Sequence, residues 1–361
     1  MNTTKNVLLL SAAFAAFSVF APEDVAAEAP HGTLLTEHIV SEKLRDTRTG
    51  LDPNRIVKVF LPPSYAASGS RRYPVLFYCH SINWSAEKMF ADGNLVKGLE
   101  RSFANGVVPE FIFVAADYST PTLGCWFENS TTTGHWLDYT VDELVPFIDA
   151  HFRTIPDRDS RGVAGDFLGG YGALKFGMLY PDVFSVVYAL HPVGTGSGIA
   201  PGHTRPDWKA VFAAKSLQDL GPNGFSWTFV AMAQAYLPNP NRPPFFCDYM
   251  VEMENGEPRV NAENVRKWET RFLLDQLLME NVAHMRSLRA IGFDWARYDP
   301  NIDHIYAVQA FTRKLDEFGI EHEAEEYRGD PWSRNFSEDG RFYTRLLPFF
   351  SRHLVFDGAA R

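Results

Sequence analysis

One stretch constrains the fold of this 361-residue chain more than any other: residues 161–174, Arg-Gly-Val-Ala-Gly-Asp-Phe-Leu-Gly-Gly-Tyr-Gly-Ala-Leu. Its apolar segment at 162–164 predicts a buried strand, and residues 168–179 predict a helix that begins directly after it. Gly165, Gly169 and Gly170 flank the turn, which indicates two backbones that approach too closely for side chains. The stretch therefore predicts a sharp strand–turn–helix unit with the bulky Phe167 at its tip.

This stretch, Gly165-Asp-Phe-Leu-Gly-Gly-Tyr-Gly-Ala-Leu174, resembles the Gly-x-Ser-Met-Gly-Gly-Tyr-Gly-Ala-Leu nucleophile elbow of the putative-esterase family of α/β-hydrolases. That family includes S-formylglutathione hydrolase (esterase D), feruloyl and acetylxylan esterases, and mycolyltransferases. The resemblance continues in residues 129–136, 142–148, 180–184, 319–323 and 347–353. It implies a doubly wound, mostly parallel α/β sheet and a lineage of carboxylic-ester hydrolases.

The resemblance also implies a Ser-Asp-His triad, and it assigns the three positions to Phe167, Asp299 and Pro331. A phenylalanine ring has no lone pair with which to attack a carbonyl, and proline cannot carry a proton. The backbone N–H groups of Leu168 and Ile82 correspond to the oxyanion hole. We therefore expect a degenerate triad without ordinary serine-esterase turnover, and we expect Phe167→Ser alone to leave the chain inactive because no base would face the new hydroxyl.

A second hypothesis is an active enzyme of the same fold that uses other residues. Asp166 is a candidate substitute nucleophile, although a structural role is favoured because the glycine spacing already places the turn at residue 167. His80, His191 and His304 follow predicted strands and are candidates for the pocket or for a base, with hydrogen-bonded structural histidines as the alternative. Their spacing indicates no metal site, and no cofactor is expected. The loop tryptophans Trp84, Trp126 and Trp136 suit stacking on a small-molecule ester, a sugar or an aromatic ligand, with core packing as the alternative.

Strands and helices alternate along the rest of the chain, which predicts one α/β domain over residues 28–361. Further strands are expected at 37–43, 55–61, 74–79, 111–116, 184–190, 290–295 and 322–327, and helices at 138–152, 262–289, 304–318 and 341–353. Residues 195–285 are rich in Pro, Gly and aromatic residues, with little clean periodicity before the helix at 262. We interpret this segment as a cap or lid inserted over the carboxyl edge of the sheet.

The first 27 residues have the pattern of a secretory signal: Lys5, an apolar run over 7–21, and Val25-Ala-Ala27 before the cleavage point. They predict export to the periplasm or the medium; an uncleaved anchor is the alternative, but the run is shorter than the ~20 residues that a span requires. No later stretch is expected to cross a membrane. The net charge of −10 argues against nucleic acid as a partner. Cys125 and Cys247 either pair, which leaves Cys79 alone, or all three thiols stay free; the oligomeric state is not indicated.

Overall fold

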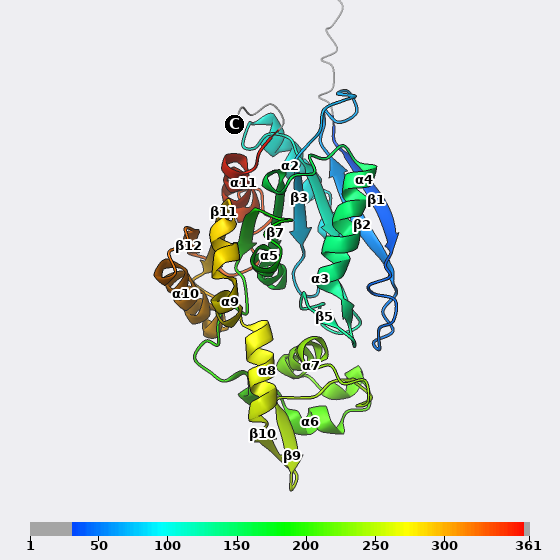
Figure 1. Ribbon diagram of the computed structural model, residues 1–361, viewed down its shortest axis with the longest axis vertical. Coiled ribbons are helices and arrows are strands. Elements are labelled where there is room, and N and C mark those ends of the chain that lie inside the picture. Colours follow the sequence, from blue (N-terminus) through cyan, green and yellow to red (C-terminus); the bar gives the residue numbers. More distant parts are fainter. Residues whose placement is uncertain (1–30, 357–361) are drawn as a thin grey trace, which may run out of the picture. The chain divides into compact units, whose positions relative to one another are not determined.

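The computed structural model describes residues 31–356, so the predicted signal at 1–27 lies outside the described residues. An eight-stranded sheet in the order β1-β2-β4-β3-β7-β8-β11-β12 forms its centre (Figure 1). The strands are β1 (Thr33–Val40), β2 (Asn54–Leu61), β3 (Val75–Cys79), β4 (Ile112–Ala116), β7 (Arg161–Asp166), β8 (Val186–Leu190), β11 (Ala290–Ala296) and β12 (Glu323–Tyr327). β2 pairs antiparallel with β1 and β4, and the strands from β4 to β12 are parallel.

Helices cover both faces of the sheet, because its inner strands are rich in apolar residues that face both sides. Every residue of β3, β4, β7 and β8 is buried, as in parallel sheets that are covered on both sides. One face packs against α1 (Ala86–Phe90), α2 (Asn94–Ala104), the π-helical turn η5 (Phe342–Leu346) and α11 (Leu347–His353). The other packs against α4 (Val145–His151), α5 (Leu168–Leu179), α9 (Leu274–Ser287) and α10 (Ile302–Glu317). The predicted doubly wound, mostly parallel α/β sheet is confirmed.

A second group of elements lies beyond the ends to which the parallel strands point (Figure 1). It contains α6 (Trp208–Ala213), α7 (Gly224–Tyr236), α8 (Ala262–Phe272) and the hairpin of β9 (Val251–Glu254) and β10 (Glu257–Val260). We call residues 195–272 the cap group. The helix expected at 262–289 is two helices, because Leu273 has an extended backbone (φ −71°, ψ 121°). Since α9 packs on α5 beside the sheet, the segment 195–285 holds both the cap group and one helix of the sheet layer.

Several shorter elements complete the described chain. They are the hairpin β5 (Asn129–Ser130) and β6 (Gly134–His135), α3 (Trp136–Asp138), the π-helical turn η1 (Tyr139–Leu144), and the 3₁₀ turns η2 (Arg158–Ser160), η3 (Gly202–Thr204) and η4 (Leu217–Leu220). The expected elements do not include α1 and α2. The helix expected at 138–152 begins two residues earlier with α3 and continues through the π-helical turn η1 into α4.

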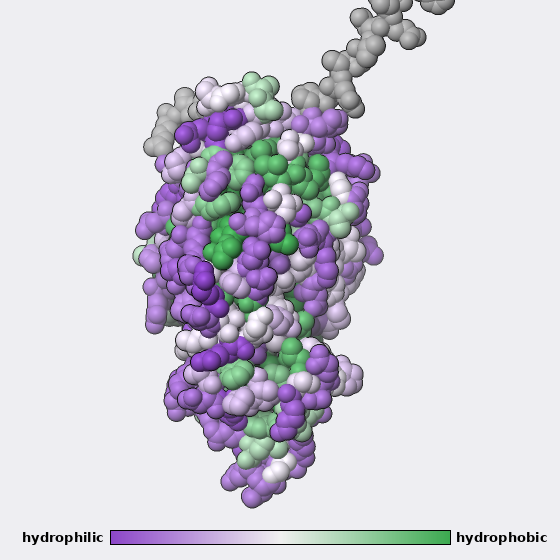
Figure 2. All heavy atoms as spheres, turned by 90° about the vertical axis from the view of Figure 1, so that its right-hand side faces the viewer, coloured by the Kyte–Doolittle hydropathy of each residue, from purple (hydrophilic) through white to green (hydrophobic). Residues whose placement is uncertain are grey.

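Three further features concern the surface, the cysteines and the length of the apolar helices. Hydrophilic residues predominate on the face shown in Figure 2, where hydrophobic residues form separate patches. Cys79, Cys125 and Cys247 are all buried and free, so the alternative of a Cys125–Cys247 bridge is not realised. Within residues 31–356, none of the helices combines the length and the apolar character that a membrane crossing demands.

Candidate active site

The turn between β7 and α5 has the strained geometry that the glycine pattern predicts. Phe167 is its single residue, with φ +53° and ψ −110°, a region that costs L-residues about 1–3 kcal/mol. The flanking glycines are required by contact: a Cβ on Gly169 would lie 1.9 Å from the carbonyl oxygen of Cys79. A Cβ on Gly165 would lie 2.4 Å from the carbonyl carbon of Gly169. Strand and helix therefore hold residue 167 at the tip of a tight elbow.

The Phe167 ring points into a cluster of rings from three other segments. It lies parallel to the His191 ring, with centroids 6.2 Å apart, and meets the His304 ring edge-on at 5.4 Å. Trp332, from the loop after β12, lies 5.5 Å away on another side. Pro331, the position expected for the triad base, is buried in the same loop next to Trp332, so this loop covers the elbow.

Asp299 follows β11 and is the centre of a hydrogen-bonded cluster that includes the two histidines beside the Phe167 ring. Its Oδ2 contacts His191 Nε2 at 2.6 Å and His304 Nδ1 at 2.8 Å, and its Oδ1 accepts the Asn301 N–H at 2.7 Å. Burial alone would raise the pKa of Asp299, but the hydrogen bonds from the two histidines outweigh it and hold this pKa well below the ordinary value. The carboxyl group is therefore an anion that orients both imidazoles.

The protons on His191 can be assigned from its partners. The backbone N–H of Ala296 donates to His191 Nδ1 at 2.8 Å, so that nitrogen carries no proton and Nε2–H donates to Asp299. His191, Asp299 and His304 bring ligand-type atoms within 4.8 Å of one another. A cation would need the Nε2 lone pair that His191 does not have in this tautomer. The donor set does not fit a metal ion.

Asp166 and His80 are engaged elsewhere. The Asp166 side chain lies on the opposite face of the sheet, where it accepts the Tyr78 hydroxyl at 3.0 Å; burial raises the pKa of this carboxyl to about 6. His80 Nε2 accepts the Tyr118 N–H at 2.8 Å, and its Nδ1 contacts the Ser81 carbonyl at 2.9 Å. Both ring nitrogens of His80 are therefore occupied by backbone groups.

Of the two backbone amides expected in an oxyanion hole, that of Leu168 lies at the elbow. Leu168 is the first residue of α5, so its N–H has no partner within the helix and points along the positive end of the helix dipole. Ile82 lines the pocket next to Phe167. Among the hydrogen bonds of residues 31–356, neither amide donates to another group. Each of the two N–H groups can therefore donate to a ligand atom.

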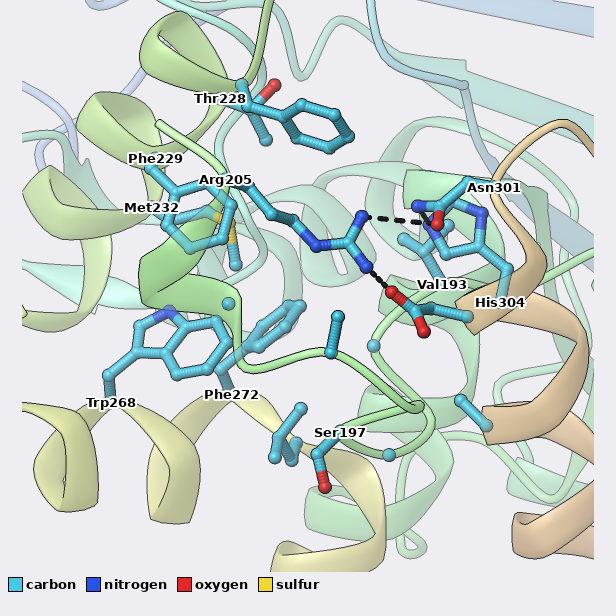
Figure 3. Close-up of a pocket in the computed structure, with 18 of the residues that line it drawn as sticks. Val193, Ser197, Arg205, Thr228, Phe229, Met232, Trp268, Phe272, Asn301 and His304 are labelled. Atoms are coloured by element: carbon cyan, nitrogen blue, oxygen red, sulfur yellow. Dashed lines mark hydrogen bonds and ion pairs between the residues drawn. The ribbon is translucent and has the colours of Figure 1, made fainter. Parts of the chain in front are cut away.

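A cavity of about 200 Å³ opens between the elbow and the cap group (Figure 3). Aromatic and thioether side chains form most of its wall: Trp126, Phe167, Phe225, Phe229, Met232, Trp268 and Phe272. Arg205 extends from the cap group toward α10, where its Nη1 donates to Asn301 Oδ1 at 3.1 Å and its guanidinium pairs with Asp303 (Figure 3). The side chain of His304 lies beside Asn301 at the same wall. This is an apolar pocket with a few convergent polar groups, the usual form of a small-molecule site.

The three loop tryptophans have different positions. Trp126 lines the cavity, whereas Trp84 is 41% exposed and lines a separate polar hollow with His80. Trp136 does not reach a pocket: it is fully buried, and its indole N–H donates to the Thr133 carbonyl at 2.8 Å. The expectation for Trp136 is thus corrected to a core position, because its ring packs under the loop rather than facing the cavity.

Three polar residues that line the cavity were not predicted from the sequence. Arg205, Asn301 and Asp303 carry no local motif, and the aromatic wall from α7 and α8 is visible in the sequence only as an excess of aromatic residues. His304 was named as a pocket candidate, but its hydrogen bond to Asp299, five residues earlier, was not anticipated. The sequence does carry one signal for this contact: Asp299 follows a strand, and His304 comes only five residues later, at the start of the next helix.

A mostly parallel sheet with helices on both faces, a strained strand-to-helix elbow and a pocket at the carboxyl edge of the strands define an α/β-hydrolase. A family model described as Putative esterase matches residues 49–234, and the chain belongs to this family. It is 33% identical over 131 residues to Esterase Rv1288 of Mycobacterium tuberculosis, a match that covers 36% of this chain. The chain spans 27% of the length of that relative.

Solved structures show the same fold at low sequence identity. A ferulic acid esterase superposes with a TM-score of 0.61 at 18% identity, covering 90% of this chain and 99% of that one. An S-formylglutathione hydrolase from Agrobacterium tumefaciens superposes with a TM-score of 0.59 at 16% identity, covering 91% of this chain and 98% of that one. These likenesses support the α/β-hydrolase architecture.

Proposed function

We propose that this chain is an exported esterase-family α/β-hydrolase with a degenerate triad, which has lost ordinary serine hydrolysis and keeps its pocket as a ligand site. The observation that carries the proposal is the elbow itself: its tip residue is Phe167, whose ring occupies the place from which a serine hydroxyl would attack. Pro331 supports it, since the loop after β12 brings no imidazole to the elbow. Export rests on the signal pattern of residues 1–27.

The ligand we propose is a small aromatic or apolar ester or acid. The cavity of about 200 Å³ exceeds the ~150 Å³ of an engineered apolar cavity that binds benzene, so it accepts one aromatic ring with a few further atoms. The aromatic wall supplies stacking surfaces, and the amides of Leu168 and Ile82 supply donors for a carbonyl or carboxylate oxygen. Relatives named as ferulic acid or feruloyl esterases are consistent with a ligand of this kind.

The test combines turnover with binding. Purified chain should hydrolyse p-nitrophenyl acetate and butyrate at the rate of buffer, and calorimetry should detect binding of ferulic or benzoic acid. Met232→Trp should abolish that binding by filling the cavity, because Met232 is buried in its wall. Met279→Trp is the matched control, since Met279 is 55% exposed on α9. Clear ester turnover by the wild type, or equal binding by both variants, would contradict the proposal.

A second candidate function is an active enzyme that uses non-standard residues. The Asp299–His304 hydrogen bond favours it, because an imidazole oriented by a carboxylate is a general base. Asp166 gives it no support, since that carboxyl faces Tyr78 on the other side of the sheet. Turnover that survives Asp166→Asn and is lost in His304→Gln would favour this candidate over the first.

A further inference from the structure

We infer that His304, oriented by Asp299, is a working base beside the elbow, so that residue 167 alone separates this chain from a functional serine hydrolase site. The inference rests on the proposed function, since it takes Phe167 to stand at the nucleophile position. It replaces the expectation that the chain lacks a base, which followed from Pro331 alone.

The tautomer of His304 follows from a chain of hydrogen bonds. Arg205 can only donate, so Asn301 Oδ1 is the acceptor of its Nη1–H at 3.1 Å. The amide nitrogen of Asn301 therefore faces His304 Nε2, 2.9 Å away, and donates to it. His304 Nε2 carries a lone pair, and the ring proton lies on Nδ1, which donates to Asp299 Oδ2 at 2.8 Å. This is the tautomer that a triad histidine needs: Nδ1–H on the acid and an electron pair on Nε2, which here accepts the Asn301 amide.

The position of His304 is also suitable, whereas that of His191 is not. His304 lines the cavity, its side chain is 20% exposed, and its ring meets the Phe167 ring at 5.4 Å. His191 is 1% exposed, and its two nitrogens are committed to Asp299 and to the Ala296 N–H. Of the two imidazoles on Asp299, only that of His304 can accept a proton from the cavity. Asp299, the acid that orients His304, is kept ionised by three hydrogen bonds.

The reaction in a Phe167→Ser variant can be written through these groups. The serine Oγ attacks the carbonyl carbon of p-nitrophenyl acetate, its proton moves to His304 Nε2, and the oxyanion is held by the N–H groups of Leu168 and Ile82. The p-nitrophenolate leaves, the proton on His304 Nε2 passes to solvent, and an acetyl-serine remains. Water then attacks the acetyl group and gives its proton to the same nitrogen, which passes it to the serine Oγ as the acyl bond breaks and acetic acid is released. The Asn301 amide, which donates to Nε2 in the wild type, must yield this place to the serine hydroxyl.

The experiment measures kcat/KM for p-nitrophenyl acetate in five proteins: wild type, Phe167→Ala, Phe167→Ser, Phe167→Ser/His304→Gln and Phe167→Ser/Pro331→His. Phe167→Ala opens the same space without a hydroxyl. We expect Phe167→Ser to exceed it by at least about 10²-fold, the lower end of what a positioned base contributes. Removing the imidazole in Phe167→Ser/His304→Gln should return the rate to the level of Phe167→Ala, and adding Pro331→His should bring no further gain.

Three results would overturn the inference: a folded Phe167→Ser no faster than Phe167→Ala, a gain that survives His304→Gln, or a gain that appears only with Pro331→His. Wild-type turnover, by contrast, would contradict the proposed function whatever the variants do. If Phe167→Ser does not fold, Phe167→Cys gives a second readout. Its alkylation by iodoacetamide at pH 7 should be about tenfold or more faster than in Phe167→Cys/His304→Gln, because the imidazole generates the thiolate. Equal alkylation rates would refute the base role.

Discussion

The strained backbone at the elbow makes a prediction whose sign is unusual: at position 167, glycine should be more stable than alanine. In an ordinary helix or strand, replacing Ala by Gly costs about 0.5–1 kcal/mol, because glycine loses more conformational freedom on folding. Residue 167 has φ +53° and ψ −110°, which costs a residue with a Cβ about 1–3 kcal/mol and costs glycine little. The difference leaves up to about 2.5 kcal/mol in favour of Phe167→Gly over Phe167→Ala.

Both variants lose the same ring contacts with His304 and Trp332, so the comparison isolates the backbone. Urea unfolding of the two proteins, followed by circular dichroism, gives the difference in free energy of unfolding. Ala310→Gly is the matched control, since Ala310 is exposed in the middle of α10 and should show the ordinary loss of about 1 kcal/mol. A Phe167→Gly variant less stable than Phe167→Ala by the same amount as the control pair would refute the strained elbow.

Three further predictions concern the surroundings of the site. Because burial raises the folded-state pKa of Asp166 from 3.8 to about 6, the carboxyl ionises at lower pH in the unfolded chain than in the folded one. The free energy of unfolding should therefore fall by about 2 kcal/mol as the pH rises from 4 to 6, and Asp166→Asn should remove that slope in urea titrations. In the wild type the buried Lys175 ammonium lies 2.6 Å from the Glu128 carboxylate. Glu128→Gln should lower the free energy of unfolding by about 3–5 kcal/mol in the same assay, because it leaves this ammonium beside a neutral amide. Gly169→Ala should lower the free energy of unfolding by about 3 kcal/mol, because the new Cβ would clash with backbone atoms. Gly69→Ala is the control and should be nearly neutral, since a Cβ there meets open space. Equal effects of the two substitutions would contradict this prediction.

The sheet and its elbow could be predicted from the sequence because their signals are local. Apolar runs at 74–79 and 111–116 lie within one residue of β3 and β4, and the glycines at the elbow are fixed by contacts with backbone atoms only a few residues or one strand away. The break at Leu273 was not predictable from periodicity, since α8 and α9 share one continuous helical pattern and only packing on different layers separates them.

The site itself was less accessible because its groups meet across long sequence distances. Trp136 and Trp126 have similar loop surroundings in the sequence, yet one is in the core and the other lines the cavity. Whether His304 faces the elbow depends on the direction of α10 after Asp299, which only the folded structure sets. Arg205, which contacts the start of α10, lies almost a hundred positions earlier in the sequence. Such contacts are set by tertiary packing, which residue type and spacing do not specify.

The most direct test of the central claim is intact-mass spectrometry of the wild-type chain after incubation with a fluorophosphonate, a reagent that reacts with activated serine hydroxyls. A serine esterase of the same family serves as the positive control. With Phe167 at the elbow, the chain should keep its unmodified mass under conditions that label the control completely. A single stoichiometric adduct, mapped by peptide analysis to any serine near the cavity, would show that an activated nucleophile exists and would contradict the loss of serine hydrolysis.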